Sequence, residues 1–520
     1  MAALFAAIGI FAAGGSIEQT SQGSKPALTL LNNFNGLGAD LEPGPGSNHP
    51  PAPRNPSDNS IAVGPQHVFQ IVNSQLAIFT KTGRILYGPA STNTIFAGAG
   101  GVCEARPNGD AVVRYDQLAT RWLVVMPIFR RTLFDADRST PGQPAKPGDA
   151  ARPSVGRPGP PPPLPPAPQR GQQPAPPAPA EGTYAICYAV SAGADPLGPY
   201  YRYAFERPLF PDYPRPAIWT DGYYVPTSTG DDVIQKHACA SERSKMLKGE
   251  PAREQCVVID GVNFLNNADI DGQALPPKGA PNVMMAAAGA QLKTIVEDDG
   301  IFVWKFHVDW EKPSNTKADG PVKIPVAPYH YLCDGQLTNC VPQPGTDRRL
   351  DAQGDKIMQR LVYRNVRGRE SIVAVHSVNS SAGGGGVRWY ELTIDKSRDV
   401  RLHQQGTYAP DRFYRWMASP AIDRQGNIAV GYSFGGSSNY PGQRFAGRLA
   451  SDPPGTLTFH ETVLVEGEAA QNVMRWEDYT QTAMDPSDDC TIWYAGDYLK
   501  KDAATYSTRI GSFRFPGCSP

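Results

Sequence analysis

The chain has 520 residues and a formal net charge of −1, and glycine and proline each occur 52 times. The near-neutral charge gives no reason to expect a polyanionic partner such as nucleic acid, and the glycine and proline contents indicate many turns. Length alone would suggest several domains, but repeat folds reach this size as a single unit.

The N-terminus begins with an apolar run, AALFAAIGIFAA at residues 2–13, followed by small residues. This pattern is typical of a secretory signal peptide, and the run is too short to span a bilayer comfortably. We predict a signal peptide over residues 1–15 and an N-terminal arm over 16–56, with one strand at Ala27–Asn32. The alternative is an apolar N-terminus without a targeting role. We expect a secreted or cell-envelope protein with no membrane span in the mature chain.

The cysteine count is even, which beside a signal-like segment favours disulfides. No Cys-x-x-Cys pair and no histidine at zinc-site spacing occurs. Cys239–Cys256 and Cys333–Cys340 are the local candidates. Cys103–Cys187 and Cys490–Cys518 would complete the set, although sequence leaves the connectivity open.

A recurring pattern organises the rest of the chain. Its clearest copy is Arg415–Ser433, which predicts a strand, a tight turn at Gln425–Asn427 and a second strand. Ala483–Tyr494 has the same spacing, and weaker copies occur earlier. The copies give seven starts, near residues 61, 111, 217, 284, 360, 421 and 483; the fourth combines Val283–Ala288 with Leu292–Val296.

Short β units at this spacing predict an all-β fold, a β-propeller of seven four-stranded blades over residues 57–518. No helix-period stretch of convincing length competes with this interpretation. The alternative is a two-domain β-sandwich. We expect a monomer.

A proline-rich segment at Thr140–Thr183 interrupts the second unit and contains GRPGPPPPLPPAPQRGQQPAPPAPAEG. Such a sequence cannot pack into a core, so we predict a disordered or polyproline surface loop. A role as a ligand for proline-binding modules is the alternative to a solvated insertion.

Several stretches resemble a family of uncharacterised secreted bacterial proteins with a sialidase-like propeller fold. These stretches are Asn55–His67, Phe79–Gly83, Tyr115–Trp122, Gly447–Ala450, Arg475–Tyr479 and Arg509–Phe513. The resemblance covers most of residues 55–518 outside the proline-rich segment. It implies the fold and secretion but no established activity. Glu477 stands where the family pattern leads us to expect a glycine.

In a propeller, the residues just before each first strand ring one mouth of the central channel, where ligands commonly bind. The acidic candidates there are Asp58, Asp110, Asp212 and Asp478. The candidate ligand-binding residues are Arg106, Tyr213, Arg360, Tyr414, Arg415, Trp416, Arg475, Trp476 and Tyr479.

This mixture suits a sugar or a carboxylate-bearing ligand, because aromatic faces stack on sugar rings, acids bind hydroxyls and arginine pairs with carboxylates. Three hypotheses follow: an extracellular propeller that binds a glycan or other small ligand, a glycoside hydrolase or lyase with carboxylates from different blades, and a scaffold for protein partners. The alternative for each residue is a strand-end cap that bonds a neighbouring blade. A sialidase is not expected, because no Ser-x-Asp-x-Gly-x-Thr-Trp motif and no Arg-Ile-Pro opening occurs.

No cofactor is expected. Asn266–Gly272 has oxygen-bearing side chains at alternate positions, as calcium loops do, but no glutamate follows at the EF-hand distance. An asparagine- and aspartate-rich turn is therefore the preferred interpretation of this stretch.

Overall fold

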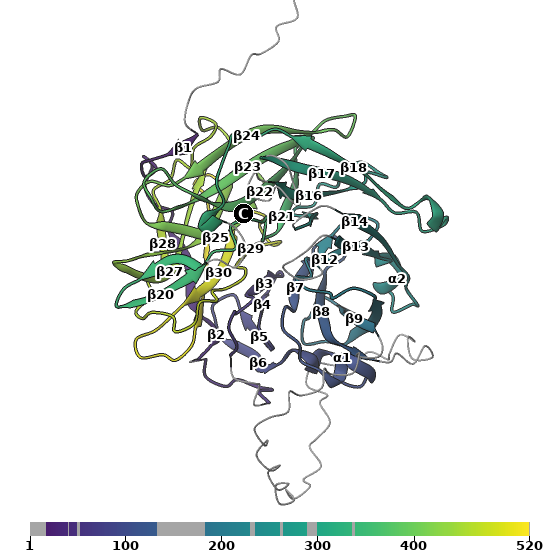
Figure 1. The fold of residues 1–520 in the computed structure, drawn as a ribbon. Coiled ribbons are helices and arrows are strands. Elements are labelled where there is room, and N and C mark those ends of the chain that lie inside the picture. Colours follow the sequence, from purple (N-terminus) through teal and green to yellow (C-terminus); the bar gives the residue numbers. More distant parts are fainter. Residues whose placement is uncertain are drawn as a thin grey trace, which may run out of the picture.

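The computed structural model describes residues 17–39, 41–48, 53–132, 183–228, 235–260, 264–288, 299–334 and 339–518. These residues form an all-β protein that contains several four-stranded antiparallel sheets. Figure 1 shows the sheets arranged around a common centre. The predicted signal segment, the predicted Pro-rich loop except for Thr183, and Leu292–Val296 lie outside the described residues.

Five sheets each contain four strands in antiparallel order. The first two are β3 (Ser60–Val63), β4 (His67–Val72), β5 (Gln75–Thr80) and β6 (Ile85–Ser91), then β7 (Val112–Asp116), β8 (Arg121–Thr132), β9 (Thr183–Ser191) and β10 (Tyr200–Arg207). The third is β11 (Ala217–Ile218), β12 (Tyr223–Ser228), β13 (Gln235–Ser241) and β14 (Glu254–Asp260). Another is β25 (Tyr414–Ile422), β26 (Ile428–Gly436), β27 (Asn439–Arg448) and β28 (Thr462–Val465).

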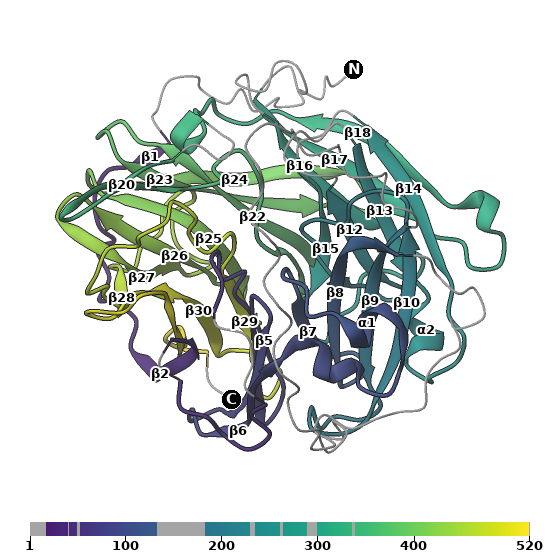
Figure 2. The ribbon, with the colours of Figure 1, turned by 60° about the horizontal axis from the view of Figure 1, so that its bottom comes forward.

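The last sheet combines the two ends of the chain. Its strands are β29 (Gln481–Met484), β30 (Ile492–Tyr498), β31 (Ser507–Phe513) and the N-terminal strand β2 (Leu30–Gly38). β2 pairs antiparallel with β31, so the arm supplies the outer strand of the C-terminal sheet. Figure 2 shows purple β2 beside the yellow strands. The sequence predicted a strand at Ala27–Asn32. The observed strand, β2, begins three residues later, at Leu30, and is longer.

A nine-stranded sheet contains two further groups of antiparallel strands. They are β15 (Asn266–Ile270), β16 (Asn282–Ala288), β17 (Gly300–His307) and β18 (Lys317–Ile324), then β21 (Leu361–Val366), β22 (Arg369–Asn379), β23 (Gly385–Ile394) and β24 (Val400–Tyr408). The parallel pair β15–β21 joins the groups, and β1 (Glu18–Gln19) adds to β24 in parallel. The predicted fourth start was wrong by one strand, because Val283–Ala288 is the second strand of its group.

Smaller elements lie in the connections. They are the hairpin of β19 (Asn339–Gln343) and β20 (Thr346–Asp351), the helices α1 (Gly101–Ala105) and α2 (Arg243–Met246), and the 3-10 turns Thr92–Phe96, Pro313–Asn315 and Leu332–Asp334. No helix in the described part of the chain is long and apolar enough to cross a bilayer.

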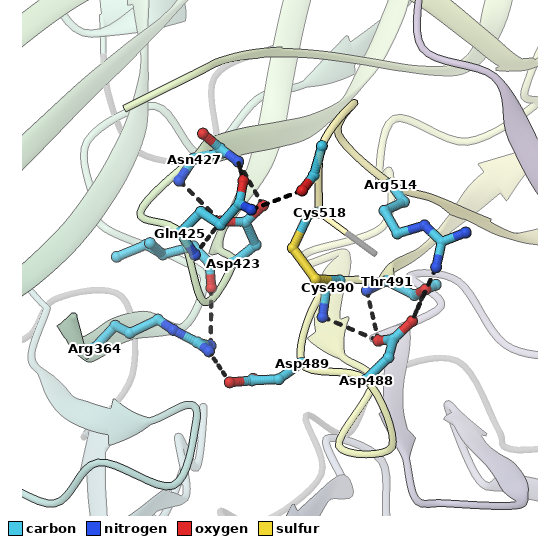
Figure 3. The surroundings of a disulfide bond; sticks show 12 residues. Arg364, Asp423, Gln425, Asn427, Asp488, Asp489, Cys490, Thr491, Arg514 and Cys518 are labelled. Atoms are coloured by element: carbon cyan, nitrogen blue, oxygen red, sulfur yellow. Dashed lines mark hydrogen bonds and ion pairs between the residues drawn. A yellow bond between two sulfur atoms is a disulfide. The ribbon is translucent and has the colours of Figure 1, made fainter. Parts of the chain in front are cut away.

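The turn of the clearest sequence repeat shows how these sheets are built. The Asp423 carboxylate accepts hydrogen bonds from the backbone N–H groups of Gln425 and Asn427, at 2.9 and 3.0 Å, and Gly426 has a φ of 88°. These bonds fix the turn because a short acidic side chain satisfies the N–H groups that the turn leaves unpaired. The Gln425 side chain then donates to the backbone of Gly517, which ties this sheet to the last one beside the Cys490–Cys518 disulfide (Figure 3).

The buried core lies within and between neighbouring sheets. The first strands contact one another in a closed circuit, in the order β3, β7, β11, β15, β21, β25, β29 and back to β3. Most of their side chains are buried, and a Cβ at Gly431 of β26 would meet the ring of Tyr494 from the next sheet. This close contact brings the residues that precede the first strands toward one centre.

All four predicted disulfides are confirmed: Cys103–Cys187, Cys239–Cys256, Cys333–Cys340 and Cys490–Cys518. Four disulfides indicate that the protein folds in an oxidising compartment.

Candidate functional site

Polar residues from five segments converge at one mouth of the circuit of first strands. We call them the mouth cluster: Asp58, Asp110, Asp212, Tyr213, Gln353, Arg475, Asp478 and Tyr479. Most of them directly precede β3, β7, β11 or β29, so the order of the sheets places them side by side. Gln353 comes instead from the connection that follows the β19–β20 hairpin.

Asp110 is the centre of a chain of carboxyl groups. Its backbone N–H donates to Asp58 Oδ2, and its own Oδ2 accepts from the Tyr213 backbone N–H, each at 3.3 Å. Burial, followed by the charge of Asp478, raises the pKa of Asp58, and burial, followed by the charge of Asp58, raises the pKa of Asp110. Burial and the neighbouring carboxylates therefore favour the protonated forms of Asp58 and Asp110.

Asp478 is held differently. Its Oδ2 accepts a bond from the Tyr213 hydroxyl at 2.9 Å and is ion-paired with Arg475, while its Oδ1 accepts from the Gln353 amide at 3.0 Å. Arg475 also lies 3.1 Å from the carboxylate of Asp351. The Asp478 carboxylate is therefore bound by one cation, Arg475, and by two neutral donors, Tyr213 and Gln353.

Asp351 ends β20 and is completely buried, and its pKa is raised to about 8 by burial and by the charge of Asp478. With Gln353 it forms the part of the site that sequence reasoning missed. The hairpin connection matches no repeat, so only the unassigned polar stretch Asp351–Lys356 signalled it.

Four side chains in the mouth cluster have a buried polar atom without a hydrogen-bond partner among the described residues, and Asp58 Oδ1 and Arg475 Nε are two of these atoms. The Tyr479 hydroxyl and the Gln353 Oε1 are both unpartnered, and the residues are 3% and 2% exposed. Burial, followed by the charges of Asp58 and Asp110, raises the pKa of Tyr479. The Arg215 guanidinium stacks over the Tyr479 ring at 4.0 Å.

Backbone conformation is unusual at the same places. Asp58, Asp110, Tyr213, Gln353 and Asp478 all have positive φ angles, between 46° and 62°. Non-glycine residues rarely adopt this region, and such strain persists only where the surrounding structure imposes it. The mouth is also accessible, because Asp110, Asp212 and Arg475 are only half-buried.

The structure places four other predicted site residues away from the mouth cluster. Arg415 lies inside β25 and is fully buried against Glu461 and Asp411, because β25 already begins at Tyr414. Trp416 and Trp476 are buried beneath the β19–β20 hairpin, with ring centroids 6.2 Å apart. Tyr414 is half-buried against Leu332.

The remaining two predicted residues differ in their surroundings. Arg106 is half-buried immediately after α1, with its Nη1 unpartnered in the described structure. Arg360 lies inside the channel, where its guanidinium contacts Asp269 at 2.7 Å and Asp271 at 2.8 Å.

Together with Arg114, the three residues Arg360, Asp269 and Asp271 form what we call the channel cluster. Arg114 lies 3.3 Å from Asp269 and donates to Gln481 at 2.6 Å, and burial lowers its pKa to about 9. All four residues line one cavity. The acidic residues belong to the stretch predicted as a turn; that prediction was wrong, since Asn266–Ile270 is a first strand, β15.

Glu477 occupies a left-handed position, with a φ of 53°. This explains the glycine expected there, because glycine adopts such angles without steric cost. Its buried carboxyl accepts bonds from Gln443 at 2.8 Å and from Ser433, and burial, followed by the charge of Asp497, raises its pKa.

One group of histidine, cysteine or acidic side chains among the described residues has ligand atoms within 4.8 Å of one another. It consists of His237, Cys239 and Cys256, and both cysteines are joined in a disulfide.

No family model and no curated protein matches the chain. It is similar in structure to a protein of unknown function from Dyadobacter fermentans DSM 18053, with 8% identity over 94% of this chain and 100% of the other, at a TM-score of 0.38. It is also similar to a polysaccharide lyase of family PL25, an ulvan lyase bound to -[GlcA(1-4)Rha3S]-, with 10% identity over 95% and 94% of the chains, at a TM-score of 0.36. A third similarity is to the WD40 domain of SCAP from fission yeast, with 9% identity over 87% and 81%, at a TM-score of 0.32.

Proposed function

We propose that the protein is a secreted, seven-bladed β-propeller that binds a hydroxyl-rich extracellular ligand, a glycan, at the mouth cluster without catalysing its cleavage. The closed circuit of first strands supports the blade count, with β15–β18 and β21–β24 as separate blades. The disulfides support secretion. Residues 1–15 would then be the signal peptide and 140–183 an insertion loop, which N-terminal sequencing and limited proteolysis of the secreted protein would test.

The observation that carries the proposal is the set of unpartnered polar atoms beside half-exposed acids. The Tyr479 hydroxyl can donate and the Gln353 Oε1 can accept, and both are buried without partners. A buried group left unbonded is unfavourable by about 1–3 kcal/mol. Sugar hydroxyls both donate and accept, so such a ligand would satisfy these atoms and bond the carboxyls of Asp58 and Asp110 at once.

Arg475 adds a preference within this ligand class. Its side chain is 31% exposed while its inner face pairs with Asp351 and Asp478. A guanidinium that keeps some donors accessible binds carboxylates well. Sugars bearing a carboxylate are therefore expected to bind more tightly than neutral ones of the same size.

Binding is favoured over hydrolysis because the acids are already engaged. Asp478 is bonded by three groups, and Asp58 accepts from the Asn73 amide at 2.7 Å. A catalytic nucleophile or base needs a carboxylate that is free to reach the substrate.

A glycoside hydrolase or lyase is the second candidate, and one observation favours it. Burial raises the pKa of Asp58 and of Asp110, while Asp478 is paired with Arg475, and acid–base catalysis uses such a difference between the surroundings of its carboxyl groups. A polysaccharide digest screen distinguishes the two, since only the enzyme yields new reducing ends or unsaturated products.

The test of binding is a glycan array, followed by calorimetry on the ligands that it finds. Asp110→Asn and Arg475→Gln are expected to weaken binding roughly tenfold or more, as the loss of a charge-assisted bond would. Asp399→Asn is the matched control, because that carboxylate is exposed on the outer rim. Binding that is equal in wild type and both mouth variants would contradict the proposal.

A further inference from the structure

The Cys239–Cys256 disulfide differs from the other three in its surroundings. It joins directly opposite residues of β13 and β14, and β14 is the outermost strand of its sheet. Cys239 is buried, whereas Cys256 is exposed. The other six cysteines are buried or half-buried, so an external reagent reaches the sulfur of Cys256 most readily.

A buried cation lies directly behind this disulfide. The Arg207 guanidinium donates to the Cys239 sulfur at 2.7 Å and to the Cys256 sulfur at 3.3 Å, and it is completely buried. An adjacent cation stabilises a thiolate, and a more stable leaving thiolate departs faster in disulfide exchange. Glu254 opposes this effect in part, because its carboxylate pairs with the same guanidinium at 2.8 Å.

We propose that Cys239–Cys256 is a thiol-exchange site, at which an external thiol forms a mixed disulfide with Cys256. The thiolate attacks the Cys256 sulfur, a new S–S bond forms there, and the bond to Cys239 breaks. The electron pair passes to the Cys239 sulfur, which remains as a thiolate beside Arg207. A second external thiol then attacks the mixed disulfide, so two external thiols are oxidised to one disulfide and the protein gains a dithiol.

The geometry assigns the two cysteines different roles in this exchange. Exposure makes Cys256 the sulfur that is attacked, and the buried contact with Arg207 makes Cys239 the leaving group. Reduction removes the covalent link between β13 and β14 but leaves their backbone ladder, so the blade edge loosens without the loss of the sheet.

The first test uses the other disulfides as internal controls. The folded protein is incubated with reduced glutathione and EDTA, quenched with a maleimide and mapped by mass spectrometry. EDTA is included because His237 lies within 4.8 Å of both sulfurs and the dithiol would trap metal. We expect glutathione on Cys256 and label on Cys239, at a rate roughly tenfold or more above that of the other pairs. Simultaneous reaction of all four pairs, or another pair reacting first, would overturn the proposal.

The second test separates the role of Arg207 from simple accessibility. Glu254→Gln frees the guanidinium from its carboxylate and is expected to raise the exchange rate several-fold. The double variant Arg207→Gln/Glu254→Gln removes both charges, leaves no buried ion uncompensated, and is expected to lower the rate below that of the wild type. If the two variants change the rate in the same direction, Arg207 does not stabilise the leaving thiolate. Near-ultraviolet circular dichroism verifies that each variant is folded.

Discussion

The mouth cluster and the channel cluster both contain arginines and aspartates, but they differ in the balance of charge. In the channel cluster two arginines face two aspartates, and each carboxylate is within 3.3 Å of a guanidinium. In the mouth cluster four aspartates accompany one arginine, Arg475 is ion-paired with only one of these four, Asp478, and burial raises the pKa of Asp58 and of Asp110.

This difference shows where binding capacity remains. A balanced set of ion pairs needs no ligand, because each buried charge already has a partner of opposite charge. We therefore interpret the channel cluster as structural. A set with an excess of acids, and with hydroxyl and amide atoms that have no partner among the described residues, is incomplete. The position of an aspartate near the propeller axis is therefore less informative than the charge balance around it.

Breaking the channel cluster should have the largest effect. Arg360→Met leaves Asp269 and Asp271 buried with only Arg114 nearby, and we expect a loss of about 3–5 kcal/mol in the free energy of unfolding. Urea denaturation measures it. Arg401→Ala, at a side chain that is 68% exposed, is the control and should change stability by less than about 0.5 kcal/mol. Equal effects of both changes would refute the structural role of Arg360.

Stability should also depend on pH through the buried acids. Between about pH 6.5 and 8, unfolded carboxyls are ionised, whereas Asp351 and Asp497, each with a pKa of about 8, keep protons in the folded protein. The folded state then binds more protons, so the free energy of unfolding falls as pH rises, on the order of 1.5 kcal/mol per group.

The histidines do not reverse this trend within that window. Burial lowers the pKa of His237 to about 4 and of His376 to about 3. The stability that these neutral histidines contribute to the free energy of unfolding is therefore lost only as pH falls below about 6.5. Denaturation curves at both ends of the window check the prediction, and Asp351→Asn should flatten the dependence. Stability that rises toward pH 8 in the wild type would exclude protonated acids at the mouth.

The smallest effect is expected at Asp58, because burial raises the pKa of its carboxyl and disfavours the charged form. Asp58→Asn substitutes a neutral amide of similar shape, so stability at neutral pH should change by less than about 0.5 kcal/mol. The matched change Asp269→Asn, at a carboxylate held by two arginines, should be unfavourable by about 2 kcal/mol or more. If Asp58→Asn is the more damaging of the two, the comparison fails.

Much of the fold follows from short-range sequence signals. The Asp423–Asn427 turn is readable because the acid, the glycine and the amide each have a local bonding role. The start near residue 284 was misplaced because β15 is polar. Its Asn266 and Asp269 look like turn residues, yet Asn266 bonds the backbone at Gln359 and Asp269 bonds Arg360, both near β21.

The site was less predictable for two physical reasons. Residues that precede a first strand converge only if the strand starts at the expected place, and β25 starts early enough to draw Arg415 and Trp416 into the sheet. The hairpin connection then contributes Asp351 and Gln353 through contacts between residues more than 120 positions apart, which no local pattern encodes.

The pairing of β2 with β31 has a consequence for biosynthesis. The hydrogen bond from Thr508 to the Leu37 carbonyl spans 471 positions, so the sheet cannot close until almost the whole chain has been made. At the usual 5–20 residues per second, the N-terminal strand waits roughly 25–95 seconds for its partner. During that time β2 has no strand partner, and its open edge is prone to mispairing. Nascent chains and fragments that lack either strand are therefore the forms of this protein most in need of a chaperone.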